Sequence, residues 1–109
     1  MTDQELTKII AEKVMGYTDP EPYETWEGET WFLWDKHNRA CKSPFFPLSN
    51  DYVCMAAWDN FITHKVPQMS SDLQRKITEA ISDIMMNEVG SDRRRSMCEC
   101  ITKAMEETS

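Results

Sequence analysis

Glycine is scarce in this chain of 109 residues, and Gly16, Gly28 and Gly90 are each more than ten residues apart. A P-loop or a dinucleotide fingerprint needs several glycines in one short segment, because the backbone must approach phosphates closely. Neither motif can be written here. No nucleophile-elbow or cysteine-protease signature surrounds any serine, cysteine or histidine. We therefore predict that the protein is not an enzyme and has no catalytic residues.

Long apolar segments are also missing, since no apolar run approaches the roughly 20 residues that cross a bilayer. The first ten residues, MTDQELTKII, lack the basic flank and continuous apolar core of a signal peptide. We expect no membrane span and a cytoplasmic location in a host cell. In that reducing compartment the four cysteines are expected to be thiols. These are Cys41, Cys54, Cys98 and Cys100.

A metal site is not favoured, because a zinc site needs four ligands at suitable spacing. Cys98 and Cys100 lie one residue apart on a predicted helix, which turns their side chains about 200° away from each other. His37 and Cys41 have a usable spacing if the turn between them is ordered, with Cys54 as a nearby third group. Against this stands the simpler interpretation of an exposed His37 and a buried Cys54. We expect neither metal nor cofactor, and a cryptic metal protein or enzyme remains a third hypothesis.

Basic residues are few in the N-terminal third of the chain. The net charge is −7, and residues 1–35 hold nine acids and two lysines, whereas residues 36–109 hold ten of each sign. Such an acidic field repels nucleic acid backbones and favours contact with a basic protein. We therefore expect no direct binding to DNA or RNA, and we expect a host or phage protein with a basic surface as partner.

Four helices are predicted from capping residues and apolar periodicity. Thr2 and Glu5 form a capping box for the first helix, which ends at Gly16. Ser49 or Asn50 caps the second, which ends near His64. Ser70 or Ser71 caps the third, which runs until Gly90, and Ser91 caps the fourth. The second helix carries an apolar stripe of Val53, Cys54, Ala57, Trp58, Phe61 and Ile62.

One or two short strands complete the predicted elements. Residues 17–30 hold five acids, two prolines and no basic residue, which predicts an exposed loop. Trp31 to Trp34 are apolar at both odd and even positions, which is typical of a strand covered on both faces. A second extended piece, at Pro44 to Pro47, is limited to an edge by its prolines.

The predicted fold class is thus α+β and predominantly helical, with residues 1–109 forming one domain. About four helices pack around a small sheet of two or three strands. Because the central strand is apolar on both faces, we expect helix, sheet and helix layers.

Three blocks of sequence resemble a known family. The opening helix runs into Ala-Glu-Lys-Val-Met-Gly-Tyr at residues 11–17; FFPLSNDYVCMAAWDNF follows at 45–61 and RRRSMCECITKAM at 93–105. Together they cover about half of the chain and resemble the phage ABA sandwich family of small bacteriophage and prophage proteins, the first block being the specific one. The resemblance implies a phage or prophage origin and a helix, sheet, helix layering. It departs at residues 68–90, where the family has strands and this chain reads as helix. The family brings no catalytic residue.

The acidic segment is the main candidate for a binding site, because its aromatic rings can anchor a partner while its carboxylates attract a basic surface. The candidate partner-binding residues are Asp19, Glu21, Tyr23, Glu24, Trp26, Glu27 and Glu29. An ordinary solvated loop is the alternative. Arg93, Arg94 and Arg95 lie in the first turn of a predicted helix, where the helix dipole disfavours cations. They are expected either to pair with acids of the same fold or to form a secondary contact with an acidic partner or phosphate.

Two hypotheses about function stand before the third one given above. The first is a non-enzymatic phage protein that binds another protein, such as an anti-CRISPR-like inhibitor of a host defence system that mimics nucleic acid. The alternative is a structural or self-assembling phage accessory protein that forms a homodimer through exposed apolar residues. Nothing in the residue pattern identifies the partner.

Overall fold

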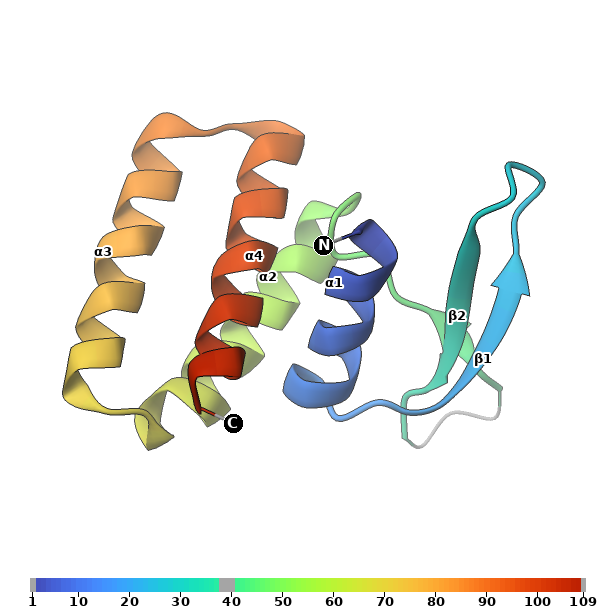
Figure 1. The fold of residues 1–109 in the computed structure, drawn as a ribbon, viewed down its shortest axis with the longest axis horizontal. Helices are drawn as coiled ribbons and strands as arrows, with labels where there is room; N and C mark the ends of the chain where they lie inside the picture. The colour runs from blue at the N-terminus through green and yellow to red at the C-terminus, as the bar shows by residue number, and fades with distance from the viewer. Residues whose placement is uncertain (1, 38–40, 109) are drawn as a thin grey trace.

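The computed structural model describes residues 2–37 and 41–108 and has a mostly helical α+β fold (Figure 1). Its elements in chain order are α1 (Asp3–Ile9), η1 (Ile10–Val14), β1 (Thr18–Glu24), β2 (Thr30–Asp35), β3 (Ser43–Pro44), α2 (Asp51–Asn60), η2 (Phe61–Lys65), η3 (Val66–Gln68), α3 (Ser71–Asn87) and α4 (Gly90–Thr108). The strands form one antiparallel sheet in the order β1-β2-β3. The predicted fold class is confirmed.

The first helix begins and ends where its sequence predicts. The Thr2 hydroxyl accepts a hydrogen bond from the Glu5 backbone N–H at 3.2 Å, which satisfies one of the unpaired donors of the first turn. After Ile9 the helix continues as the π-helical turn η1. Gly16 then adopts a φ of +72°, the left-handed conformation that ends helices. Its carbonyl oxygen accepts a hydrogen bond from Nε2 of His37 at 2.6 Å, which joins this turn to the end of β2.

Replacing Gly16 with alanine is expected to lower the free energy of unfolding by about 1–2 kcal/mol, because only glycine adopts this conformation readily. An added Cβ would lie 3.9 Å from His37 Nε2, an ordinary contact, so the loss comes from the backbone alone. Gly16→Asn is the matched control, since asparagine tolerates positive φ and should lose less. Urea denaturation measures both, and equal losses for the two variants would contradict this explanation.

The acidic segment after Gly16 is a strand rather than the predicted loop. Residues of β1 pair with β2 in antiparallel register, with Glu21 opposite Leu33 and Tyr23 opposite Trp31, and the register shifts between Thr18 and Glu21. Proline has no backbone N–H to donate to a neighbouring strand, but β1 is an edge strand with one open side. Because residues two apart direct their backbone nitrogens to the same side, Pro20 and Pro22 are both compatible with this pairing. The loop prediction was wrong for Thr18–Glu24 and holds only for the turn that follows.

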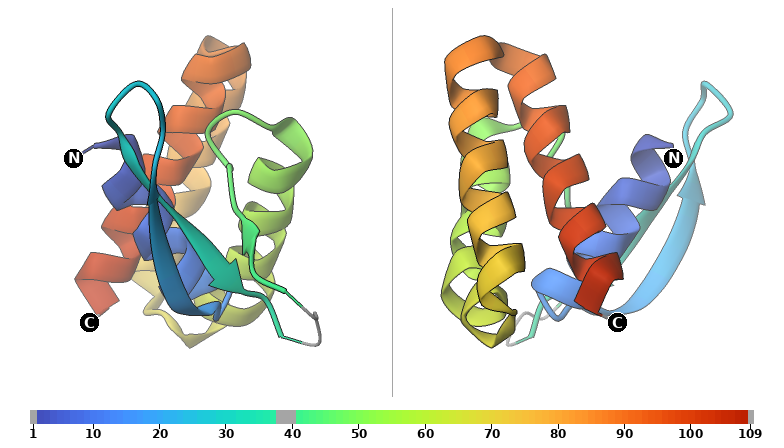
Figure 2. Two further views of the ribbon diagram at one scale, coloured as in Figure 1. Left: turned by 90° about the vertical axis from the view of Figure 1, so that its right-hand side faces the viewer. Right: turned by 60° about the vertical axis from the view of Figure 1, so that its left-hand side comes forward.

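The layering of the sheet also differs from the prediction. Trp34 is buried in the core with 1% of its surface exposed, but Trp31, Phe32 and Leu33 are only half-buried. Figures 1 and 2 show the sheet as an outer layer, with α1 between it and α4, and none of the described helices lies on its far side. The predicted cover by helices on both faces was therefore wrong. Trp31 is instead covered in part by the ring of Phe46, 5.6 Å away between centroids.

The remaining helices follow their predicted caps with one exception. Asn50 accepts a hydrogen bond from the Val53 N–H at 3.1 Å, and Ser70 accepts one from the Leu73 N–H at 3.3 Å. Ser91 is not a cap, because α4 already begins at Gly90. On the second helix the stripe ends at Phe61, and Ile62 is exposed where the wider turn of η2 rotates it outward. The core is formed mainly by η1, α2, η2 and α4, together with Trp34 of β2.

Candidate functional site

The β1–β2 hairpin projects from the helical body and ends in a turn with defined hydrogen bonds (Figure 1). Backbone N–H groups of Gly28 and Thr25 donate to the carbonyl oxygens of Thr25 and Glu29, both at 2.9 Å. The Glu29 N–H also donates to Oγ1 of Thr25 at 3.3 Å. Gly28 has a φ of +86°, which the turn requires and which glycine permits. The backbone of the turn is therefore fixed by hydrogen bonds within the turn itself.

Trp26 lies in this turn and is 95% exposed. In this exposed position the indole ring contributes no burial of apolar surface to the stability of the fold. Tryptophan is, however, among the residues most enriched at the centre of protein interfaces. It is the most exposed of the large hydrophobic side chains among the described residues. Tyr52 on α2, at 89%, comes next.

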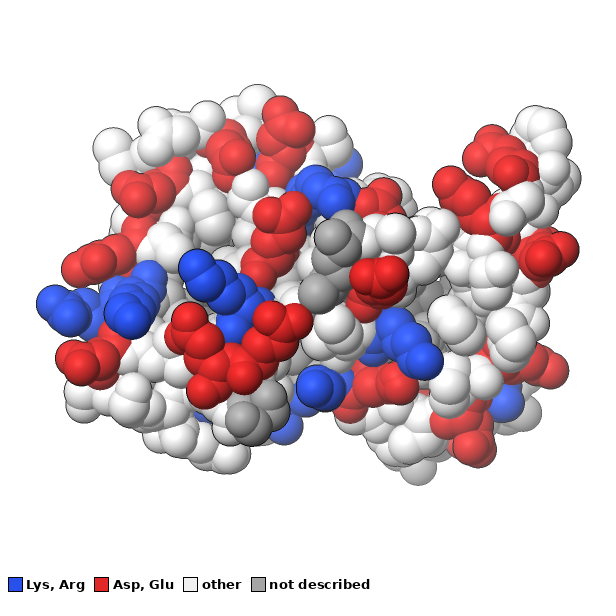
Figure 3. Space-filling view, in the orientation of Figure 1, with Lys and Arg blue, Asp and Glu red and all other residues white. Residues whose placement is uncertain are grey.

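The carboxylates of the hairpin are distributed along β1 and the turn that follows it. Asp19, Glu21, Glu24, Glu27 and Glu29 are all exposed, and within residues 2–37 and 41–108 no ion pair involves them. Figure 3 shows the projecting tip with Asp and Glu side chains and without Lys or Arg beside them. Such a cluster of one sign sends its field into the solvent for about 8–10 Å at physiological salt. All of the predicted partner-binding residues thus lie on one hairpin, with Tyr23 half-buried on its inner part.

The three arginines are held within the fold and lie away from the hairpin, on α4. Arg93 donates to the carbonyl oxygens of Glu88 and Met85, Arg94 to the Leu48 carbonyl oxygen and Asp51, and Arg95 to Asp3 and Glu99. Of the arginines that form ion pairs, Arg94 is the most buried, and its Nη1 lies 2.7 Å from Oδ1 of Asp51. These contacts correspond to the structural alternative predicted for the arginines. Their contact with an external acidic group stays a prediction.

The metal hypothesis gains no support in the described part of the chain, where no three His, Cys, Asp or Glu side chains are grouped as ligands. His37 is used to hold Gly16, as described above. Cys54 and Cys98 are buried and meet between α2 and α4, and their thiols share a hydrogen bond. That bond, together with burial, raises the pKa of Cys98. Burial also raises the pKa of Cys100.

Thiol labelling at pH 8 is therefore expected to show one fast cysteine. Cys41 is exposed, and the raised pKa of Cys98 and Cys100 keeps these two protonated, whereas only a thiolate attacks the reagent. The hydrogen bond with Cys98 lowers the pKa of Cys54, but Cys54 is buried, so the reagent does not reach it in the folded protein. Reaction with a chromogenic disulfide, followed by absorbance, should give one rapid equivalent, with the others appearing on unfolding in urea. The Cys41→Ser variant should lose the rapid phase, and a persistent rapid phase in that variant would contradict the assignment.

Sequence reasoning missed a cleft on the inner side of the hairpin. It has a volume of about 320 Å³ and is bordered by α1, the hairpin and the segment after β3. Its aromatic residues are Tyr23, Trp31 and Phe46, which are distributed over three segments. The doublet Phe45-Phe46 was visible in the sequence, but nothing in it indicates that Phe45 is buried while Phe46 meets Trp31.

No protein-family model, curated protein or solved structure matches this chain. The resemblance to the phage ABA sandwich family consequently stays a prediction. Among the described residues no helix combines the length and apolar character needed to cross a membrane.

Proposed function

We propose that this protein acts by binding another protein through the acidic, tryptophan-tipped β1–β2 hairpin. The observation that carries this proposal is the nearly complete exposure of Trp26 on a turn held by its own hydrogen bonds. A rigid aromatic side chain loses little conformational entropy when a partner covers it, which is why such residues dominate binding energies.

The surrounding carboxylates define the kind of partner. Five acids without an internal ion pair among the described residues attract a basic surface from a distance and accelerate association. Trp26 then anchors the encounter at short range. The partner expected from this combination is a protein with a basic surface and a pocket for one aromatic ring.

The family resemblance implies a phage or prophage origin, and with that origin the expected partner is a protein of a bacterial host. Many basic surfaces of bacterial proteins bind nucleic acid, and a rigid row of carboxylates can occupy the positions of phosphates. We therefore propose a host defence nuclease, or its regulator, as the target class and inhibition as the outcome. This choice of target class rests on the similar charge of the hairpin carboxylates and nucleic acid phosphates, and not on a similarity of fold.

Capture from a bacterial lysate at low ionic strength tests the proposal. Immobilised protein should retain a protein with a basic, nucleic-acid-binding surface, and added duplex DNA should displace it. The matched variant replaces Glu21, Glu24, Glu27 and Glu29 by glutamine, which keeps size and hydrogen bonding while removing four charges. It should retain much less of the same protein. Capture that neither DNA nor the glutamine variant reduces would contradict the proposal.

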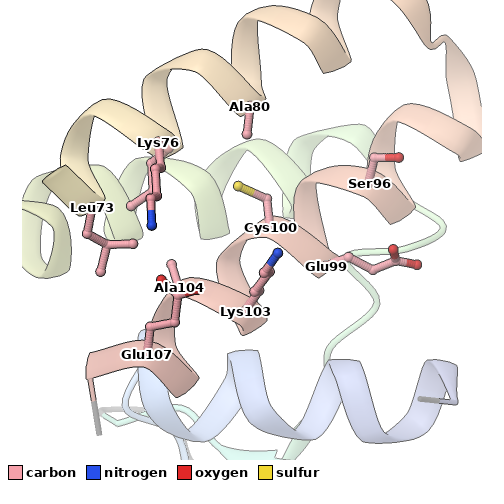
Figure 4. Close-up of a pocket in the computed structure, with 10 residues that line it drawn as sticks. Leu73, Lys76, Ala80, Ser96, Glu99, Cys100, Lys103, Ala104 and Glu107 are labelled. Carbon is pink, nitrogen blue, oxygen red and sulfur yellow. The ribbon is translucent and has the colours of Figure 1, made fainter.

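A second candidate, self-association, is favoured by the groove between α3 and α4. Only Ile77 of α3 is buried although the helix is strongly amphipathic, and the groove beside it has a volume of about 450 Å³. Figure 4 shows the side chains of Lys76, Cys100 and Lys103 in the space between the two helices. Lysines and the acidic Glu107 line the same groove, so two copies related by a two-fold axis can pair opposite charges.

Charge reversal distinguishes this candidate from the first. A Lys76→Glu and Lys103→Glu double variant should sediment as a monomer where the wild type dimerises. Mixing it with a Glu99→Lys and Glu107→Lys variant should restore a mixed dimer, because the reversed charges complement each other. A wild type that remains monomeric throughout a concentration series in sedimentation velocity would rule out self-association and leave the hairpin proposal intact.

A further inference from the structure

The cleft beneath the hairpin turn, defined above by Tyr23, Trp31 and Phe46, has flat aromatic surfaces in a fixed arrangement. Trp31 and Phe46 meet edge to face, with planes 71° apart. Tyr23 lies directly opposite Trp31 in the β1–β2 register. At about 320 Å³ the cleft is at the lower end of the range for small-ligand pockets, about 300–1,000 Å³. It is thus large enough for one long side chain and too small for a bulky ligand.

The charge around these rings is negative. Oε2 of Glu29 accepts a hydrogen bond from Nε1 of Trp31 at 3.1 Å, which holds a carboxylate beside the indole. Asp3 also lines the cleft, but Arg95 neutralises it. Glu29 therefore supplies the negative charge beside the rings, and this charge favours a cation.

The inner end of the cleft is formed by a buried residue of α1. Thr7 is the most deeply buried residue that lines the cleft, with 4% of its surface exposed. Its hydroxyl makes no hydrogen bond to any of the described residues. This oxygen is itself covered by protein atoms, so Thr7 closes the inner end of the cleft and does not offer a hydrogen-bond acceptor to a ligand.

We propose that this cleft binds an arginine side chain of the partner protein, an inference that rests on the protein-binding role proposed above. A guanidinium is flat, weakly hydrated and always charged, so it stacks on aromatic rings while its five N–H donors reach oxygen atoms around it. The rings of Trp31 and Phe46 supply the stacking surface, and Glu29 supplies the anion. Lysine has a compact, strongly hydrated charge that uses flat surfaces less well.

Blocked tripeptides with a central arginine, lysine or citrulline test this inference directly. Citrulline keeps the planar shape of arginine without its charge. In two-dimensional NMR titrations the arginine peptide should shift the indole N–H resonance of Trp31 and leave that of Trp58, buried in α2, unchanged. Lysine should bind about threefold more weakly, and citrulline more weakly still.

Phe46→Leu is the informative variant, because Phe46 is already partly exposed and its replacement should leave the fold intact. It should weaken arginine binding about threefold, whereas Tyr52→Leu, which changes an exposed aromatic residue of α2 that does not line the cleft, should not. Equal binding of arginine and lysine together with no effect of Phe46→Leu would overturn the cleft assignment but leave the acidic hairpin proposal standing. No shift of Trp31 with any peptide would also overturn it. Failure of the hairpin proposal would appear separately, as capture that the glutamine variant does not reduce.

Discussion

Trp26→Ala is expected to weaken binding of the captured partner by about 30-fold or more. Central tryptophans of interfaces contribute 2 kcal/mol or more when truncated to alanine, and 1.4 kcal/mol corresponds to a factor of ten. The effect should lie mainly in the dissociation rate, because Trp26 acts after the charges have brought the two proteins together. Surface plasmon resonance with the purified partner measures both rates.

Tyr52→Ala provides the matched control for this variant. Tyr52 is an aromatic residue of similar exposure, but it lies on α2 rather than on the hairpin. Its loss should leave the affinity unchanged within about twofold, the usual range for substitutions outside an interface core. If both variants weaken binding equally, the hairpin has no special role. The glutamine variant should instead reduce the association rate, with the largest reduction at low salt.

Trp34→Ala is expected to lower the free energy of unfolding by about 3–5 kcal/mol, the range for truncating a large aromatic side chain in a core. Trp34 is 1% exposed and lies among the buried residues that join the sheet to the helices. Because domains of this size have a total stability of about 5–15 kcal/mol, the variant should be close to unfolding at room temperature. Urea denaturation followed by circular dichroism gives the value.

Trp26→Ala again serves as a comparison, since it removes the same kind of side chain from an exposed position in the turn before β2. Its change in stability should stay within about 0.5 kcal/mol. A loss of less than about 1 kcal/mol for Trp34→Ala would show that the sheet is attached to the helices by other contacts. The two tryptophans thus separate the role of the sheet in folding from the role of the hairpin in binding.

Local signals in the sequence predicted the helices well. Thr2, Asn50 and Ser70 cap their helices as expected, because each cap depends on residues only three positions away. The helix at residues 71–87, where the resembled family has strands, was also read correctly from its apolar period. Ser91 was assigned wrongly because Gly90, at a φ of +59°, begins the helix one residue earlier.

The candidate site was predicted in its residues but not in its shape. Acids and prolines in residues 17–30 indicated exposure, which holds, and also indicated a loop, which does not. Pairing of β1 with β2 decides the conformation there, and an edge strand needs fewer backbone donors than a central one. The family origin, the partner and the inhibitory role stay proposals that the capture experiment addresses.

By itself the sequence determined the mostly helical class, the positions of the caps and the acidic N-terminal third, because these depend on near neighbours along the chain and on composition. Tertiary structure alone decided that the sheet is an outer layer, that the arginines of α4 bind within the fold, and that Thr7, Trp31 and Phe46 share one cleft. The reason is physical. Those contacts join residues far apart in sequence, and they stabilise the protein only once the chain has folded. No local periodicity or spacing in the sequence therefore predicts them.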